Sequence, residues 1–205
     1  MVRTRETLAL AIDHLSTAEP GFAALIARLG APEPRNSEPG AATLLRTIVG
    51  QQVSVAAARS MWNKLEAIYG SPPDLAPIVR ASDEELRAAG LSRQKAGYSR
   101  SLAELVLAGE LDLAALPLDD EEAIALLTRI KGIGRWSAEI YLLFAEGRAD
   151  AFPAGDLAVQ VGLGRLLGHD ERPSEKRLRE LAEPWRPYRG AAAVLAWHHY
   201  NTEVL

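Results

Sequence analysis

Apolar residues recur at helical spacing along almost the whole chain, and this periodicity most restricts the fold. Between residues 53 and 69, for example, three- or four-residue steps separate the apolar positions, as expected for one buried helix face. These positions are Val53, Ala57, Met61, Leu65 and Ile68. No run of alternating apolar and polar residues bounded by hairpin turns stands beside them. The sequence therefore predicts an all-α protein of roughly ten helices with short connections.

Capping residues indicate where several of these helices begin. The expected N-caps are Ser82, Ser92, Asp119 or Asp120, and Ser174. Ser82 is followed three residues later by Glu85, which is the spacing of a capping box. A last, alanine-rich helix is expected from about residue 188 to residue 200.

Two irregular stretches divide the helical pattern. Residues 31–40 are rich in proline and polar side chains, and residues 147–156 are interrupted by glycine and proline. Such segments are typical of a chain that crosses from one substructure to another and returns. We therefore expect two helical lobes, the first formed by residues 1–38 and 151–205 and the second by residues 39–150.

Composition excludes several classes of function. The chain of 205 residues contains no cysteine, which excludes disulfides, zinc–thiolate sites, cysteine nucleophiles and iron–sulfur clusters. Its net charge of -4 argues weakly against a nucleic-acid partner, because domains that bind nucleic acids are often basic. The apolar stretch at residues 8–12 is too short for a signal peptide or a membrane span. A cytoplasmic protein without a membrane partner is expected.

A glycine-containing turn at residues 130–134 separates two predicted helices. The sequence there is Ile-Lys-Gly-Ile-Gly, and a new helix begins at once with Arg135 and Trp136. Unpaired amides at a helix N-terminus attract an anion such as a nucleic-acid phosphate, and Lys131 and Arg135 would add positive charge. A corner in which the glycines serve only tight packing explains the pattern equally well.

Two further polar positions have both a structural and a chemical interpretation. Asp156 follows Pro-Ala-Gly at an expected helix start, where it acts as an N-cap or as a carboxylate that stabilises a cationic centre in a substrate. Gln51 and Gln52 interrupt an apolar stretch. Their amides suit the support of an orphaned base, and a solvent-facing corner would suit them as well.

In order and spacing, the three segments together resemble the helix–hairpin–helix superfamily of DNA base-excision glycosylases, and within it the 3-methyladenine or alkylbase branch. The resemblance extends from about residue 43 to residue 200. It implies a DNA-binding cleft between the lobes and damaged double-stranded DNA as the partner of a monomer. The implied reaction is hydrolysis of the N-glycosidic bond of alkylated purines in base excision repair.

The resemblance also implies a role for each residue. Asp156 would be the catalytic carboxylate, Trp136 and Trp197 would line the base pocket, and Gln52 with Gln51 would fill the gap in the duplex. The hairpin would bind phosphate through Lys131, Gly132, Ile133, Gly134 and Arg135. The backbone carbonyls of Thr128, Ile130 and Ile133 would hold a monovalent Na⁺ or K⁺ ion, and no other cofactor is expected.

Trp136 occupies the position where other branches of the superfamily have a lysine that forms a Schiff base. A glycosylase without strand-cleaving lyase activity is therefore expected. Two alternatives stay open: a sister enzyme acting on deaminated or oxidised bases, and a non-catalytic DNA-binding module that keeps the hairpin.

Overall fold

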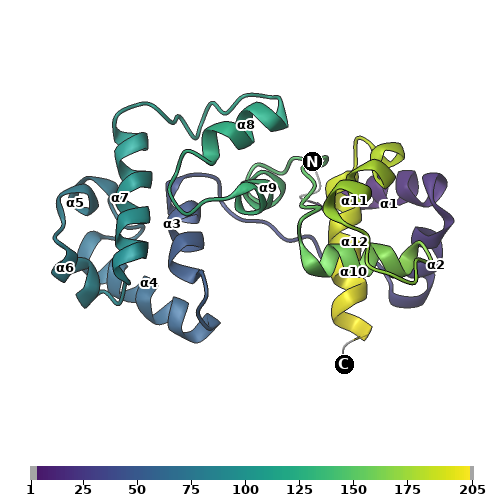
Figure 1. The fold of residues 1–205 in the computed structure, drawn as a ribbon, viewed down its shortest axis with the longest axis horizontal. Coiled ribbons are helices and arrows are strands. Elements are labelled where there is room, and N and C mark those ends of the chain that lie inside the picture. Colours follow the sequence, from purple (N-terminus) through teal and green to yellow (C-terminus); the bar gives the residue numbers. More distant parts are fainter. Residues whose placement is uncertain (1–3, 204–205) are drawn as a thin grey trace. The chain divides into compact units, whose positions relative to one another are not determined.

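The structure, a computed structural model, describes residues 4–203. All the regular elements in this part of the chain are helices, twelve of them α-helices and one a short 3₁₀ helix (Figure 1). The all-α prediction is confirmed. The chain divides into two compact units: unit 1 comprises Met1–Ser37 and Leu142–Leu205, and unit 2 comprises Glu38–Tyr141.

Unit 2 contains six complete helices and most of a seventh. They are α3 (Ala41–Gly50), α4 (Val55–Tyr69), α5 (Leu75–Arg80), α6 (Asp83–Ala88), α7 (Arg93–Leu107), α8 (Asp120–Leu127) and α9 (Arg135–Phe144), whose last turn belongs to unit 1. Helix α7 packs against α3 and α5, and α3 also packs against α4. Leu44, Ile48 and Leu102 are fully buried in this core.

The buried face of α4 differs from the prediction. Trp62 and Leu65 are its buried residues, whereas Ile68 is 52% exposed and Val53, before the helix, is 39% exposed. The periodic pattern identified the helix correctly and placed its apolar face wrongly at both ends. Arg46 lies over the Trp62 ring, 4.2 Å from its centroid, so a neighbouring helix decides which part of α4 is covered.

Unit 1 is built from both ends of the chain. Its helices are α1 (Arg5–Ala18), α2 (Pro20–Leu29), α10 (Leu157–Leu166), α11 (Glu175–Leu181), the 3₁₀ helix η1 (Glu183–Trp185) and α12 (Arg189–Glu203). The core of this unit includes Leu15, Phe22 and Leu163. The Phe22 ring meets the Trp185 ring edge to face, with centroids 5.2 Å apart.

Small residues let α10 and α12 approach each other closely (Figure 1). A Cβ added at Gly162 would lie 2.6 Å from the carbonyl oxygen of Ala196, so only glycine fits between the two backbones. Alanines 191–193 and 196 on α12 are fully buried. This contact holds the start of α10 at a fixed place beside the middle of α12.

The return to the first unit comes earlier in the chain than expected. The sequence assigned residues 142–150 to the second lobe, but they are part of unit 1. Asp150 accepts hydrogen bonds from Arg186 and Arg189, and the amide of Gly190 donates to the carbonyl of Ala149 at 2.8 Å. These bonds connect the segment to the start of α12.

Candidate functional site

Asp156 is the N-cap of α10 and is also bonded to an indole on α12. Its Oδ1 accepts a hydrogen bond from the amide of Val159 at 3.0 Å and another from Nε1 of Trp197 at 3.0 Å. The capping interpretation is therefore confirmed. The hydrogen bond from Trp197 is not needed for helix capping, however. It fixes the carboxylate against an aromatic side chain.

The loop before Asp156 is rigid and largely buried. Residues 151–154 are buried. Nε2 of the buried Gln160 donates to the carbonyl of Ala154 at 2.8 Å, and the Arg179 guanidinium donates to the carbonyl of Phe152 at 3.2 Å. These bonds give side-chain partners to backbone carbonyls of a buried loop, and the Phe152 carbonyl also accepts from the amide of Ala154 at 2.8 Å. The carboxylate is thus presented from a preorganised loop.

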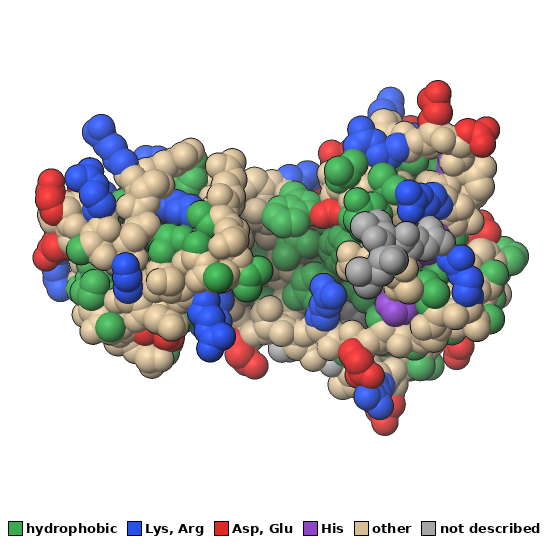
Figure 2. Space-filling view, turned by 90° about the horizontal axis from the view of Figure 1, so that it is seen from below, with side chains coloured by type: hydrophobic (Ala, Val, Ile, Leu, Met, Phe, Trp, Pro, Cys, Tyr) green, Lys and Arg blue, Asp and Glu red, His purple; other side chains and the backbone are tan. Residues whose placement is uncertain are grey.

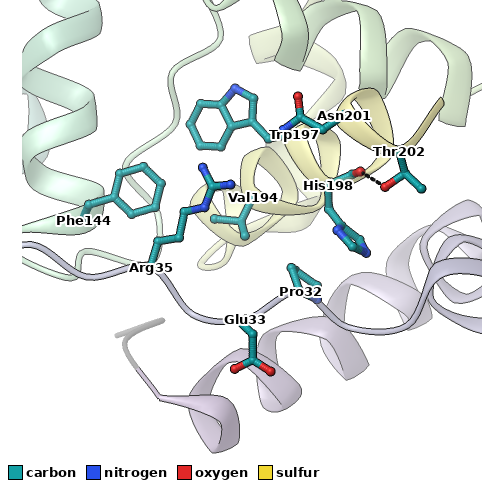
Figure 3. Close-up of a pocket in the computed structure, with 9 residues that line it drawn as sticks. All are labelled: Pro32, Glu33, Arg35, Phe144, Val194, Trp197, His198, Asn201 and Thr202. Carbon is teal, nitrogen blue, oxygen red and sulfur yellow. Dashed lines mark hydrogen bonds between the residues drawn. The ribbon is translucent and has the colours of Figure 1, made fainter. Parts of the chain in front are cut away.

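Trp197 and Phe144 form an aromatic pair beside Asp156. Their ring centroids are 5.7 Å apart and the rings are tilted by 30°. A cavity of about 260 Å³ opens next to them, and Figure 3 shows the Arg35 guanidinium extending toward both rings. The complete lining is Pro32, Glu33, Arg35, Phe144, Val194, Trp197, His198, Asn201 and Thr202. Phe144 was not among the expected site residues, although it ends the same helix that begins beside Trp136.

The glycine turn of unit 2 is a hairpin joining α8 to α9. Ile130 and Ile133 are buried and anchor it, and the amide of Ile133 donates to the carbonyl of Ile130 at 3.0 Å. Gly132 has a φ of 84°, and a Cβ there would lie 2.1 Å from a ring carbon of Tyr98. A Cβ at Gly134 would meet no atom within 4 Å. The first glycine thus serves internal packing, while the second leaves open space beside the backbone.

Arg135 is already engaged by two carboxylates. Its guanidinium donates to both carboxylate oxygens of Glu121 and, at 3.0 Å, to Oε1 of Glu139, which is 2% exposed. The hydrogen bonds to Glu121, followed by Coulomb attraction to both carboxylates, raise the pKa of Arg135 above its ordinary value. The sequence predicts that this charge faces a phosphate, and the structure shows that the same guanidinium also links α9 to Glu121 of α8. Lys131 is exposed, and its ammonium has no partner within residues 4–203.

The two glutamines after α3 have different environments. Nε2 of Gln51 donates to the carbonyl of Gly132 in the hairpin at 2.8 Å. Gln52 is exposed and has a φ of 54°. Both border a hollow of about 1010 Å³ in unit 2. Lys95 and Tyr98, two lining residues that the sequence did not single out, come from the start of α7.

The expected residues thus form two groups. Asp156 and Trp197 are hydrogen-bonded in unit 1. Gln51, Gln52, Trp136 and the hairpin glycine Gly132 border the same hollow in unit 2. Trp136 is 46% exposed, which is unusual for so large an aromatic residue.

Within residues 4–203, no helix is long and apolar enough to cross a membrane. The same part of the chain contains no group of three or more His, Cys, Asp or Glu side chains arranged to hold a metal ion.

An all-helical fold with a glycine hairpin at the start of one helix and a fixed carboxylate at the start of another defines the helix–hairpin–helix class of protein. The chain belongs to the HhH-GPD superfamily of base excision DNA repair proteins, whose family model matches residues 45–187.

Similar proteins support the same assignment. DNA-3-methyladenine glycosylase 1 of Schizosaccharomyces pombe is 33% identical over 192 residues, which cover 90% of this chain and 84% of that protein. A structure of the 3-methyladenine DNA glycosylase of this yeast with abasic DNA matches 95% of this chain and 97% of that one, with a TM-score of 0.78 and 31% identity. The DNA-3-methyladenine glycosidase of Bacillus halodurans matches 95% of this chain and 90% of that one, with a TM-score of 0.87 and 31% identity.

Proposed function

We propose that the protein is a DNA glycosylase that hydrolyses the N-glycosidic bond of alkylated purines of the 3-methyladenine type, in base excision repair. The observation that carries the proposal is the Asp156 carboxylate, fixed by the amide of Val159 and the indole of Trp197 beside an aromatic pair. Family membership and the names of similar proteins support the same reaction. The location proposed with this function is the cytoplasm, in association with the nucleoid if the protein is bacterial.

The chemistry suits a single carboxylate. A purine alkylated at N3 or N7 is a cationic leaving group, so its bond to C1′ breaks with the electron pair going to the base. Positive charge then develops on the sugar, and a nearby carboxylate stabilises it. Water adds to C1′ and loses a proton, which leaves an abasic site and a free base. Asp156 stabilises the cation and orients this water.

The base pocket is assigned to aromatic side chains. A base must leave the duplex before it can react. Trp197 and the neighbouring Phe144 present ring faces next to Asp156. Trp136 is the third aromatic residue proposed to line the base pocket. A cationic purine gains roughly 0.5–2 kcal/mol from such a face. This attraction favours charged alkylpurines over neutral, undamaged bases.

The hairpin is assigned to DNA phosphate. The backbone amides of Gly132 and Gly134 and the ammonium of Lys131 are the proposed contacts, with open space beside Gly134 for a close approach. The Ile133 amide is already bonded to the Ile130 carbonyl, so Ile133 contributes by holding the turn. Arg135 contributes by bracing α9.

A monovalent cation at the hairpin is also proposed. The carbonyls of Thr128, Ile130 and Ile133 would hold it, since carbonyl oxygens suit Na⁺ and K⁺. The Ile130 carbonyl accepts one amide hydrogen bond and keeps a second lone pair for an ion. The ion would add positive charge near the phosphate.

Asp156→Asn tests the mechanism. Asparagine is a good N-cap and its oxygen still accepts hydrogen bonds, so only the charge is removed. We expect base release from DNA containing 3-methyladenine or 7-methylguanine to fall at least about 100-fold in single-turnover assays. Binding of abasic DNA should stay within about threefold of wild type.

Asp119→Asn is the matched control. Asp119 caps α8 with the same geometry, accepting from the amide of Glu122 at 2.9 Å, and its substitution should leave base release unchanged. Full activity of Asp156→Asn would contradict the mechanism. A panel of oligonucleotides with hypoxanthine, uracil and 8-oxoguanine tests the sister-enzyme alternative, and wild-type protein that binds DNA but releases no base would favour a non-catalytic module.

The proposed enzyme should not cleave the strand. Trp136 cannot form a Schiff base, and Nζ of Lys95, a lysine at the hollow of unit 2, donates to the carbonyl of Val49 at 2.7 Å. Borohydride treatment during the reaction should therefore trap no covalent protein–DNA adduct. A stable adduct on a denaturing gel, or strand breaks without alkali, would refute this prediction.

A further inference from the structure

The loop after α3 has a strained backbone at one residue. Gln52 is the only non-glycine residue between positions 4 and 203 with a positive φ, which is 54°. A residue with a Cβ adopts this conformation only where its surroundings enforce it. The contacts of the residues that precede Gln52 therefore need an explanation.

Lys95 holds the end of α3, just before the strained residue. Its Nζ donates to the carbonyl of Val49 at 2.7 Å. Val49 is in the last turn of α3, where helix carbonyls lack intrahelical partners and a cation is favourable. Burial lowers the pKa of Lys95 below its ordinary value, so this ammonium is partly withdrawn from water.

Gln51 ties the same loop to the hairpin. Its Nε2 donates to the carbonyl of Gly132 at 2.8 Å, across 81 positions of sequence. Its backbone amide also bonds to the carbonyl of Ile48 at 3.3 Å. Side chain and backbone of Gln51 are thus both committed inside the protein.

The hairpin is itself fixed, so it can serve as an anchor. The Tyr98 ring occupies the space where a Cβ of Gly132 would lie, and Nε2 of Gln94 donates to the Tyr98 hydroxyl at 2.5 Å. The amide of Lys131 donates to Oγ of Ser101 at 3.1 Å. Helix α7 therefore supports the hairpin through Tyr98 and Ser101. It also supports the loop after α3 through Lys95.

We propose that Gln51 and Lys95 are positioning residues, and that Gln52 alone enters the duplex when the damaged base leaves it. This inference rests on the proposed glycosylase function and assigns different roles to two adjacent glutamines. Gln52 is exposed, and its side chain has no hydrogen-bond partner within the described residues. Gln51 and Lys95 hold the backbone that leads into it, at positions 51 and 49, so that the side chain is directed outward before DNA arrives.

A double-mutant cycle tests the proposal. The variants are Gln51→Met, which keeps the length but removes the donor, Gln52→Ala, and the double substitution. Base flipping is followed by the fluorescence of 2-aminopurine placed beside an abasic-site analogue, and base release is measured in parallel. We expect each single variant to lose roughly tenfold in flipping and the double variant to lose no more than either, because both remove the same inserted side chain.

Conservative and control variants separate positioning from general damage to the fold. Lys95→Met should reduce flipping and Lys95→Arg should restore it, because arginine can still donate to the Val49 carbonyl. Lys64→Met changes an exposed side chain of α4 outside these contacts, so it should leave flipping unchanged both alone and combined with Gln52→Ala. Melting temperatures of the Gln51 variants should stay within about 3 °C of wild type.

Two outcomes would overturn the proposal. Multiplying losses in the Gln51/Gln52 double variant would mean that both side chains act independently, and wild-type flipping by Gln51→Met would mean that the tether is unnecessary. Absence of base release from wild type together with a coupled cycle would instead refute the proposed glycosylase and leave the positioning role intact.

Discussion

Asp156 combines a structural and a chemical role in one carboxylate. As an N-cap it stabilises α10, and as a negative charge beside Trp197 it is proposed to stabilise a cationic sugar. Different substitutions separate the roles. Asp156→Ala should lower the free energy of unfolding by about 1 kcal/mol and the melting temperature by about 3 °C, whereas Asp156→Asn should change stability little. Thermal unfolding followed by circular dichroism measures both.

Asp119→Ala provides the comparison, since it removes an equivalent cap from α8. Asp119→Ala should lower the free energy of unfolding by about as much as Asp156→Ala, while base release stays at the wild-type level. If Asp156→Ala were as stable as wild type, the cap would contribute nothing and the carboxylate would be held for chemistry alone.

The residue scale also shows what sequence reasoning can reach. A cap depends on neighbours within three positions, so Asp156, Ser82, Ser92 and Ser174 were all predicted as N-caps and are confirmed. The bond from Trp197 to Asp156 joins positions 41 apart and was not predicted; the family resemblance only assigned each residue its own role in the site. The tether from Gln51 to Gly132 was not predicted, because nothing local to either residue indicates it.

At the scale of elements, the hairpin contains two glycines with different tasks. Gly132→Ala would place a methyl group in the Tyr98 ring at a φ of 84°, so we expect a loss of at least about 1–2 kcal/mol of stability. Gly134→Ala should leave stability within about 0.5 kcal/mol, because no atom lies within 4 Å of the new Cβ. Its methyl group would instead obstruct a DNA backbone, which should weaken binding roughly tenfold.

Gly97→Ala is the control for this pair. Gly97 lies within α7, and a Cβ there also meets nothing within 4 Å. Alanine in a helix should preserve or increase stability and leave DNA binding unchanged. Chemical denaturation and fluorescence anisotropy with abasic DNA give the two measurements. Unimpaired DNA binding by Gly134→Ala would argue that the hairpin backbone does not approach a phosphate.

Helices could be predicted where the spacing of apolar residues alone defines them. Buried faces and unit boundaries were harder to predict because tertiary contacts decide them. The helices that begin at Asp83, Arg93 and Glu175 follow their predicted caps directly. The buried face of α4 was predicted wrongly at both ends because packing against other helices decides which residues are buried there. The return to unit 1 was placed too late because the bonds of residues 149 and 150 to the start of α12 are long-range.

At the scale of the whole molecule, the net charge is -4, and many of the charged side chains form local ion pairs. Figure 2 shows Lys and Arg side chains dispersed over the visible face, with Asp and Glu side chains among them. Several arginines are bound by carboxylates, as Arg135 is by Glu121 and Arg189 by Asp150. Such arginines contribute little net charge toward DNA. Of the two cations expected to add positive charge at the hairpin, Lys131 and Arg135, only Lys131 has no carboxylate partner among the described residues.

This charge distribution predicts a shallow salt dependence of DNA binding with one identifiable contributor. Each phosphate neutralised by a cation adds about 0.9 to the slope of log affinity against log salt concentration. Lys131→Met in the Asp156→Asn background should therefore reduce the magnitude of the slope by about 0.9 for abasic DNA. Lys64→Met, at an exposed position on α4 in the same unit, should leave the slope unchanged. Equal slopes for wild type and Lys131→Met would mean that the hairpin binds DNA through its backbone amides alone.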